Sequence, residues 1–207
     1  MTIDHRVETF VVHHRTEPFD SLFVFLSRIG SYGLVWILIA AVVAFTSRRP
    51  WILPLVVIAY AIGDLTSGLL KRVFDRPRPD VDTLMQVPHT PGFPSGHATT
   101  SFACAATLAR FVSKRVAVAL YALAILISWS RVYVGAHYPL DIVGGAVLGL
   151  AIARALRPLP EARRRLLQAQ RQGSPRFRFR GRPPEGTAPE SRSDESERTP
   201  SRPPRDR

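Results

Sequence analysis

Five long apolar runs alternate with short polar connections along the chain. They occupy residues 31–47, 51–70, 98–112, 115–131 and 138–156. The first two runs have almost no charged face, whereas a helix at the surface of a soluble protein needs one. Several runs are shorter than the ~20 residues of an isolated transmembrane helix, so a soluble bundle of buried helices is the alternative. We predict an all-α, polytopic transmembrane bundle of five spans, forming one membrane-embedded domain over residues 31–156.

Two further features refine this architecture. Residues 1–30 contain "PFDSLFVFLSRIG", which is apolar on one side and too short to cross a bilayer. It predicts an interfacial helix, with a sixth, tilted span as the alternative. Gly145 and Gly149 have the four-residue spacing that lets helix backbones approach closely in lipid. Simple flexibility is the alternative explanation for these glycines.

The C-terminal region, 157–207, differs from the rest in composition. It contains 14 Arg and 7 Asp or Glu, with repeated Pro, Ser and Gly. Such a segment buries too little apolar surface to offset its ordering entropy, so we predict a disordered basic tail. Arginine alternates with phenylalanine in "PRFRFRGRPP", which raises nucleic-acid binding as an option. Attraction to anionic membrane lipids explains the charge more simply, and we predict no nucleic-acid partner.

Charged connections predict the orientation in the membrane. With five spans, Arg48–Arg49 and Lys114–Arg115 lie on the same side as the basic tail. Because Lys and Arg accumulate on the cytoplasmic side, that side is predicted to be cytoplasmic. The loop 71–97 and the turn 132–137 then lie on the extracytoplasmic face of a multi-pass cell-membrane protein.

Three polar stretches fall on that face. They are "KRVFDRPRP" (71–79), "PSGH" (94–97) and "SRVYVGAHYPLD" (130–141). An alternating path through the membrane brings all three to one surface. The side chains and amides that gather there belong to Lys71, Arg78, Ser95, Gly96, His97, Arg131, His137 and Asp141.

These residue types suit a phosphoryl group. Guanidinium groups match phosphate oxygens, and free amides at a helix start, with Ser95 as the expected N-cap, favour an anion. Two imidazoles allow one to attack phosphorus while the other protonates the leaving oxygen. Asp141, four residues after His137, is placed to orient that ring. A metal site of His97, His137 and Asp141 is the alternative, disfavoured because the neighbouring cations would repel a divalent ion.

The three stretches resemble the signature motifs of the type-2 phosphatidic acid phosphatase superfamily, which includes the vanadium haloperoxidases. The family pattern is Lys, six residues, Arg-Pro; then Pro-Ser-Gly-His; then Ser-Arg, five residues, His, three residues, Asp. The chain matches it from Lys71 to Asp141. The resemblance covers about residues 31–156.

This resemblance implies a metal-independent phosphatase without a cofactor. His137 would take the phosphate covalently and Asp141 would orient it. His97 would protonate the leaving group and then activate water. The phosphate oxygens would be held by Lys71, Arg78, Ser95, Gly96 and Arg131.

The three motifs do not specify the substrate, which is predicted from the position of the site. A site at the outer mouth of an apolar bundle suits a lipid phosphate, and we favour a polyprenyl diphosphate such as the undecaprenyl carrier. Phosphatidylglycerophosphate and phosphatidic acid are alternatives. A catalytically silent lipid-phosphate binder or transporter, and a vanadate-dependent peroxidase, are alternatives of other classes. The oligomeric state is left open. Asp64, an acid within the second span, is expected to pair with a donor in the protein interior. It would either support a cation of the site or make a plain structural hydrogen bond.

Overall fold

The computed structural model describes residues 3–160, 162, 165, 167 and 168. Most of the predicted tail, 157–207, lies outside the described residues. The described part of the chain is all-helical, as predicted. Its helices are α1 (Ile3–His13), α2 (Glu17–Gly30), α3 (Leu34–Thr46), α4 (Ile52–Phe74), α5 (Gly96–Leu108), α6 (Lys114–Tyr133) and α7 (Pro139–Ala155), with 3-10 turns at Ser31–Gly33 and Ala109–Phe111.

Each of the five apolar runs forms a helix, from α3 to α7. By length and composition α4 and α6 can each cross a membrane, and α2 with α3 makes a third candidate that bends by 65°. As single helices α3, α5 and α7 have only 13, 13 and 17 residues. Helix length therefore does not fix the number of spans, and the count of five stays a prediction.

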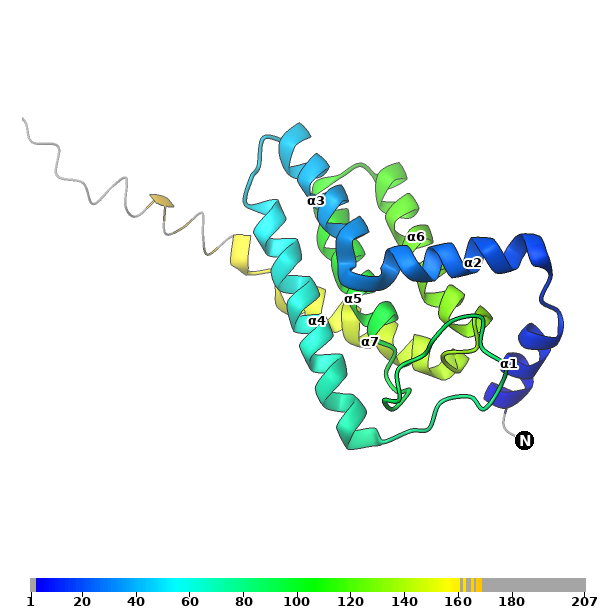
Figure 1. The fold of residues 1–207 in the computed structure, drawn as a ribbon. Helices are drawn as coiled ribbons and strands as arrows, with labels where there is room; N and C mark the ends of the chain where they lie inside the picture. The colour runs from blue at the N-terminus through cyan, green and yellow to red at the C-terminus, as the bar shows by residue number, and fades with distance from the viewer. Residues whose placement is uncertain (1–2, 161, 163–164, 166, 169–207) are drawn as a thin grey trace, which may run out of the picture.

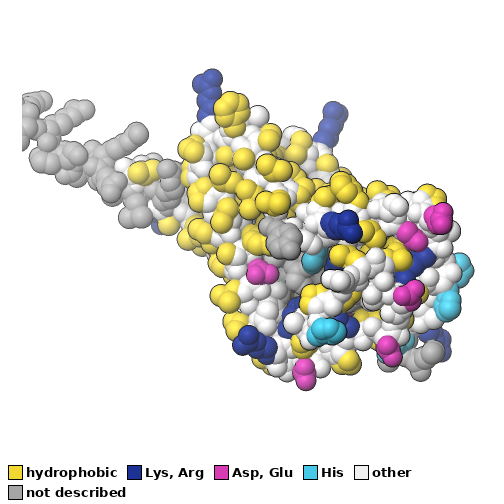
Figure 2. All heavy atoms as spheres, in the orientation of Figure 1, with side chains coloured by type: hydrophobic (Ala, Val, Ile, Leu, Met, Phe, Trp, Pro, Cys, Tyr) yellow, Lys and Arg dark blue, Asp and Glu magenta, His cyan; other side chains and the backbone are white. Residues whose placement is uncertain are grey.

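The outer faces of the helices are apolar. Leu38 of α3, Leu65 of α4, Val118 of α6 and Val147 of α7 are each more than half exposed. Contiguous apolar surface of this kind is disfavoured in water and stable in hydrocarbon. In Figure 2 hydrophobic side chains cover the upper part of the visible face, whereas charged side chains and histidines gather at lower right. This separation is that of a membrane protein with one polar end.

The helix α5 lies at the centre, packed against α4, α6 and α7 (Figure 1). Nine of its 13 residues are buried, and most of these are Ala, Ser or Thr. The close approach expected of the α7 glycines is present: a Cβ on Gly145 would lie 2.6 Å from the Ser95 carbonyl oxygen, and one on Gly149 would lie 2.4 Å from that of Thr99. Two helix backbones therefore touch directly beside the start of α5.

Gly145→Ala is expected to destabilise the fold by about 1–3 kcal/mol, because the added methyl group meets backbone that cannot give way without shifting α5. Gly68→Ala in α4 is the matched control, since a Cβ there meets nothing within 4 Å. We expect that variant to be unchanged or more stable by up to about 1 kcal/mol. Unfolding of the purified protein in detergent measures both. Equal stability of Gly145→Ala and wild type would contradict the close packing.

The N-terminal segment contains two helices, where the sequence predicts one. The helix α2 runs across the bundle, bent by 65° from α3, and α1 lies beside the 75–95 connection and the start of α7 (Figure 1). The helix α2 buries Leu26, Ser27 and Gly30 against the bundle and exposes the apolar side chains of Phe19, Leu22 and Phe25. This amphipathic pattern suits the predicted interfacial position, which stays a prediction.

Candidate active site

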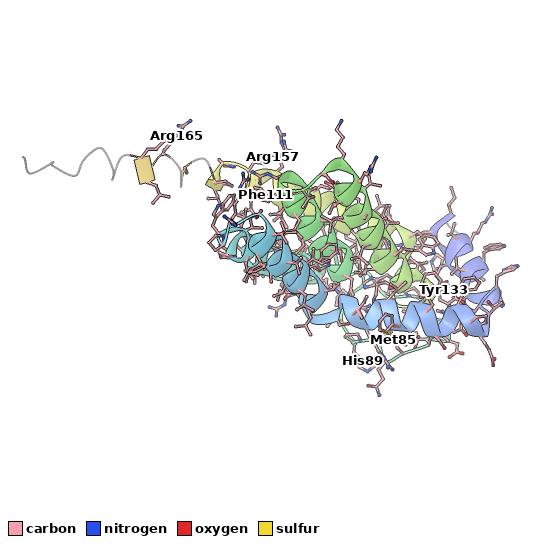
Figure 3. The ribbon with its side chains drawn as sticks, turned by 90° about the horizontal axis from the view of Figure 1, so that it is seen from above. Met85, His89, Phe111, Tyr133, Arg157 and Arg165 are labelled. Atoms are coloured by element: carbon pink, nitrogen blue, oxygen red, sulfur yellow. The ribbon has the colours of Figure 1, made fainter. Side chains whose placement is uncertain are left out.

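Two chain reversals, between α4 and α5 and between α6 and α7, bring the predicted residues to the polar end of the bundle. Lys71 lies in the last turn of α4, which ends where Asp75 adopts a left-handed conformation (φ 43°). The helix α5 begins at Gly96. Between α6 and α7 the chain turns at Gly135 (φ 79°), where a side chain would be strained. In Figure 3 the labelled residues Met85, His89 and Tyr133 lie at this end of the bundle, and Phe111 and Arg157 lie at the opposite end.

These reversals surround a cavity of about 510 Å³. Six of the eight predicted site residues line it: Lys71, Arg78, Gly96, His97, Arg131 and His137. The other two, Ser95 and Asp141, are fully buried behind its wall. Residues separated by as many as 66 positions in the sequence therefore border one space.

His137 is fixed by its neighbours on both ring nitrogens. Its Nδ1 lies 3.3 Å from Oδ2 of Asp141, and its Nε2 lies 3.3 Å from Nη1 of Arg78. Burial, with the positive charges of Arg78 and Arg131, holds the pKa of the His137 imidazole well below its usual range. The ring is therefore neutral at neutral pH. With its Nδ1 proton on the Asp141 side, the Nε2 lone pair faces the cavity.

His97 lies at the start of α5 on the cavity wall. Its Nε2 is 3.2 Å from the hydroxyl oxygen of Ser31, which in turn donates to the Ser27 carbonyl oxygen at 3.0 Å. A Cβ on Gly30 would come within 3.2 Å of the His97 ring. The turn between α2 and α3 therefore holds the second imidazole in place.

The cations approach the cavity from separate elements. Arg78 donates to the carbonyl oxygens of Thr90 (2.7 Å) and Ala136 (2.8 Å), which fix its guanidinium beside His137. Arg131 is buried and donates to the Ser27 hydroxyl. Its Nε has no hydrogen-bond partner among the described residues. A buried donor of this kind, beside a cavity, is available to an anionic ligand.

Two sequence-based expectations need correction. Asp64 does line the same cavity as Lys71, but it is exposed, and among the described residues its carboxylate has no hydrogen bond or ion pair. Its predicted pairing in the interior is therefore wrong, because the helix face it shares with Lys71 opens onto a cavity. Ser95 occupies the N-cap position of α5, but its side chain makes no capping hydrogen bond. Its hydroxyl is buried without a partner in the described part of the chain.

Three residues that support the two histidines were not predicted from the sequence: Ser31, Asp4 and Arg76. Arg76 donates to Asp141 Oδ1 at 2.6 Å. The only signal for it in the sequence is a second arginine two positions before Arg78. Ser31 and Asp4 come from the N-terminal segment, for which no motif gives a position relative to the three polar stretches.

The arrangement can bind an oxyanion and present a neutral imidazole to it. The amides at the start of α5 and three cations supply donors. Among the residues that the structure describes, no group of three or more His, Cys, Asp or Glu side chains could hold a metal ion. The cavity wall therefore combines donors suited to an oxyanion with two imidazoles, His97 and His137.

Comparison with known proteins gives the family. The model of the PAP2 superfamily matches residues 51–165. The chain is 32% identical over 154 residues to an undecaprenyl-diphosphatase of Sulfolobus acidocaldarius, which covers 71% of this chain and 74% of that protein. All three polar stretches fall within the matched region.

Two solved structures have the same fold. The crystal structure of a transmembrane PAP2-type phosphatidylglycerolphosphate phosphatase from Bacillus subtilis superposes with a TM-score of 0.66 and 25% identity, over 77% of this chain and 85% of that one. Aquifex aeolicus LpxE gives the same TM-score and identity over 75% and 95%. This chain belongs to the PAP2 superfamily and is a membrane lipid phosphatase of that family.

Proposed function

We propose that this phosphatase removes the terminal phosphate of a polyprenyl diphosphate through a phosphohistidine intermediate on His137. One observation carries the proposal. His137, oriented by Asp141, and His97 border the same cavity as Lys71, Arg78 and Arg131. A phosphoryl group held by those cations would lie between a nucleophile and an acid.

The first step transfers the phosphoryl group to the protein. An N–H of Arg78 points at Nε2 of His137, so we infer that Arg78 turns to a phosphate oxygen when substrate binds. The Nε2 lone pair then attacks phosphorus, the P–N bond forms, and the bond from phosphorus to the lipid oxygen breaks. His97, which takes up a proton when the phosphate anion binds beside it, gives that proton to the lipid oxygen, and Asp141 stabilises the positive charge on the His137 ring.

The second step restores the protein. His97, now neutral, accepts a proton from water while the water oxygen attacks phosphorus and the P–N bond breaks. The electron pair returns to Nε2 of His137, and inorganic phosphate leaves. Lys71, Arg78, Arg131 and the amides of Gly96 and His97 would stabilise the charge on the phosphoryl oxygens in both steps. Ser95, buried beside Gly96, would join them if its hydroxyl turns toward the cavity.

We propose the same membrane orientation as the sequence predicts. Five helices, α3 to α7, would span the bilayer, with the cavity at the extracytoplasmic face. Arg48, Arg49, Lys114 and Arg115 lie at the helix ends opposite the cavity, which favours a cytoplasmic position for that end and for the tail. The polar head of a lipid would then reach the site from the outer leaflet.

A lipid diphosphate is favoured over a phosphate monoester for two reasons. Its leaving group is a phosphate, which is less basic than an alkoxide and needs less help from His97. The second reason is the similarity to an undecaprenyl-diphosphatase, which supports a polyprenyl chain as the lipid part of the substrate. The likeness to a phosphatidylglycerolphosphate phosphatase supports that monoester as the second candidate.

Release of inorganic phosphate by the purified full chain tests the substrate. The panel contains a polyprenyl diphosphate, its monophosphate, diacylglycerol diphosphate and phosphatidylglycerophosphate. These substrates distinguish a preference for the diphosphate head group from a preference for the polyprenyl chain. We expect the polyprenyl diphosphate to have the highest kcat/KM, by at least about tenfold over phosphatidylglycerophosphate, or about 1.4 kcal/mol. A preference for phosphatidylglycerophosphate would overturn the polyprenyl assignment and support the second candidate.

A further inference from the structure

The two oxygens of the Asp141 carboxylate have different partners. Oδ2 faces Nδ1 of His137 and accepts the backbone N–H of Tyr138 at 3.0 Å. Oδ1 accepts an N–H of Arg76 at 2.6 Å. The carboxylate is fully buried, and a buried charge needs partners for both oxygens. Arg76 is the partner of Oδ1, the oxygen that does not contact His137.

Arg76 is itself held from three directions. Its other terminal nitrogen forms an ion pair with Asp4 of α1, and its guanidinium lies 4.7 Å from the centre of the Tyr138 ring. Asp4 also accepts the N–H of Leu140, at 2.9 Å, in the first turn of α7. A planar guanidinium is suited to join two carboxylates in this way. The result is a continuous chain of contacts from Asp4 through Arg76 and Asp141 to His137.

Arg76 and Arg78 stand on either side of Pro77 and both border a neighbouring cavity. Only Arg78 also lines the cavity that holds both histidines. Only a quarter of the Arg76 side chain is exposed. Its contacts are with the carboxylate behind His137 and with α1, so it has no direct access to the proposed phosphate position.

We propose that Arg76 is a positioning residue, which acts on the reaction by holding Asp141 against His137, and that Asp4 of α1 fixes Arg76 for this purpose. The inference rests on the proposed function, because it assigns Arg76 a part in the phosphoryl transfer at His137. Without Arg76 the buried Oδ1 has lost its cation, and the carboxylate turns toward Arg78 or takes up a proton. In either case it no longer orients His137.

The expected result for Arg76→Gln is a kcat lower by about 10²-fold, with KM within about threefold of wild type, because the reacting ring is displaced while the phosphate cations remain. Arg76→Lys keeps a charge for Asp141 but cannot join it to Asp4 in a fork, so we expect it to recover most of the lost kcat. Asp4→Asn should lower kcat in the same direction by about tenfold. Arg72→Gln is the matched control, since Arg72 is exposed at the end of α4, and it should behave as wild type.

A double-mutant cycle with Asp141→Asn makes the test specific. If Arg76 acts through Asp141, Arg76→Gln changes kcat by less than about threefold in the Asp141→Asn background. Additive losses, a change in KM alone, or wild-type kcat for Arg76→Gln would each overturn the inference. If Arg76→Gln does not fold, Asp4→Asn takes its place in the cycle. Its effect on kcat should likewise disappear in the Asp141→Asn background, and additive losses would again overturn the inference. Turnover by wild type and Arg72→Gln verifies the proposed function separately, since its absence would contradict that function.

Discussion

His137→Asn is expected to lower phosphate release by about 10⁴-fold or more, because removal of the nucleophile in covalent catalysis costs on that order. Asparagine keeps an N–H for Asp141, which lies 3.3 Å from the His137 ring, so the fold should survive. The lone pair of its amide nitrogen is delocalised into the carbonyl group and does not attack phosphorus. The variant therefore tests the loss of the nucleophilic atom, Nε2, without a change in the packing around it.

The measurement is phosphate release by purified full-length protein in detergent, with a lipid diphosphate as substrate. His89→Asn is the matched control, since His89 is exposed on the 75–95 connection and does not line the cavity of His97 and His137. It should retain wild-type turnover. Turnover of His137→Asn within tenfold of wild type would remove His137 as the nucleophile.

The second large effect is expected at His97. Its two proposed tasks are to protonate the lipid oxygen and then to take a proton from water. His97→Asn should therefore slow lipid turnover by about 10²–10⁴-fold, the range for general acid–base catalysis. An aryl phosphate such as p-nitrophenyl phosphate has a leaving group that needs no acid. With this substrate the variant should still complete the first step and stall at the second.

Rapid mixing distinguishes the two steps. We expect His97→Asn to release up to one equivalent of p-nitrophenol per protein in a burst, followed by slow turnover, while wild type shows a steady rate. The hydrogen bond between Ser31 and His97 should not matter here, because the imidazole ring that it orients is absent from the variant. A variant that is equally slow in both steps, with no burst, would mean that His97 does not act as the base for water.

The sequence was sufficient for the helices because their apolar runs are long and well separated. All five predicted runs form helices, with ends within a few residues of the expected positions. The number of membrane crossings was harder to predict. The helix α5 is short because it is enclosed by neighbours, so its length follows tertiary packing more than bilayer thickness.

The polar end was predictable for a topological reason. Lys71, His97 and His137 each lie next to the end of an apolar run, and runs that alternate in direction must bring such ends together. The Asp141–His137 contact follows from helical spacing, since α7 begins at Pro139 and carries Asp141 in its first turn. Local geometry and an alternating path were enough for these residues.

The supporting residues could not be found in this way. Asp4 reaches Arg76 across 72 positions, and Ser31 reaches His97 across 66. Their partners depend on how α1 and α2 fold back onto the bundle. Amphipathicity predicts that a helix has two faces, but not which neighbour either face meets. The predicted pairing of Asp64 was wrong for a related reason, because nothing in the sequence shows that its helix face opens onto a cavity.

The most direct test of a phosphohistidine mechanism is to identify the phosphorylated atom. His97→Asn is quenched with alkali during the burst, digested and analysed by tandem mass spectrometry, since phosphohistidine is stable to base. We predict one phosphoryl group, on Nε2 of His137. A phosphoryl group on any other residue, or a burst without a phosphorylated protein, would contradict it.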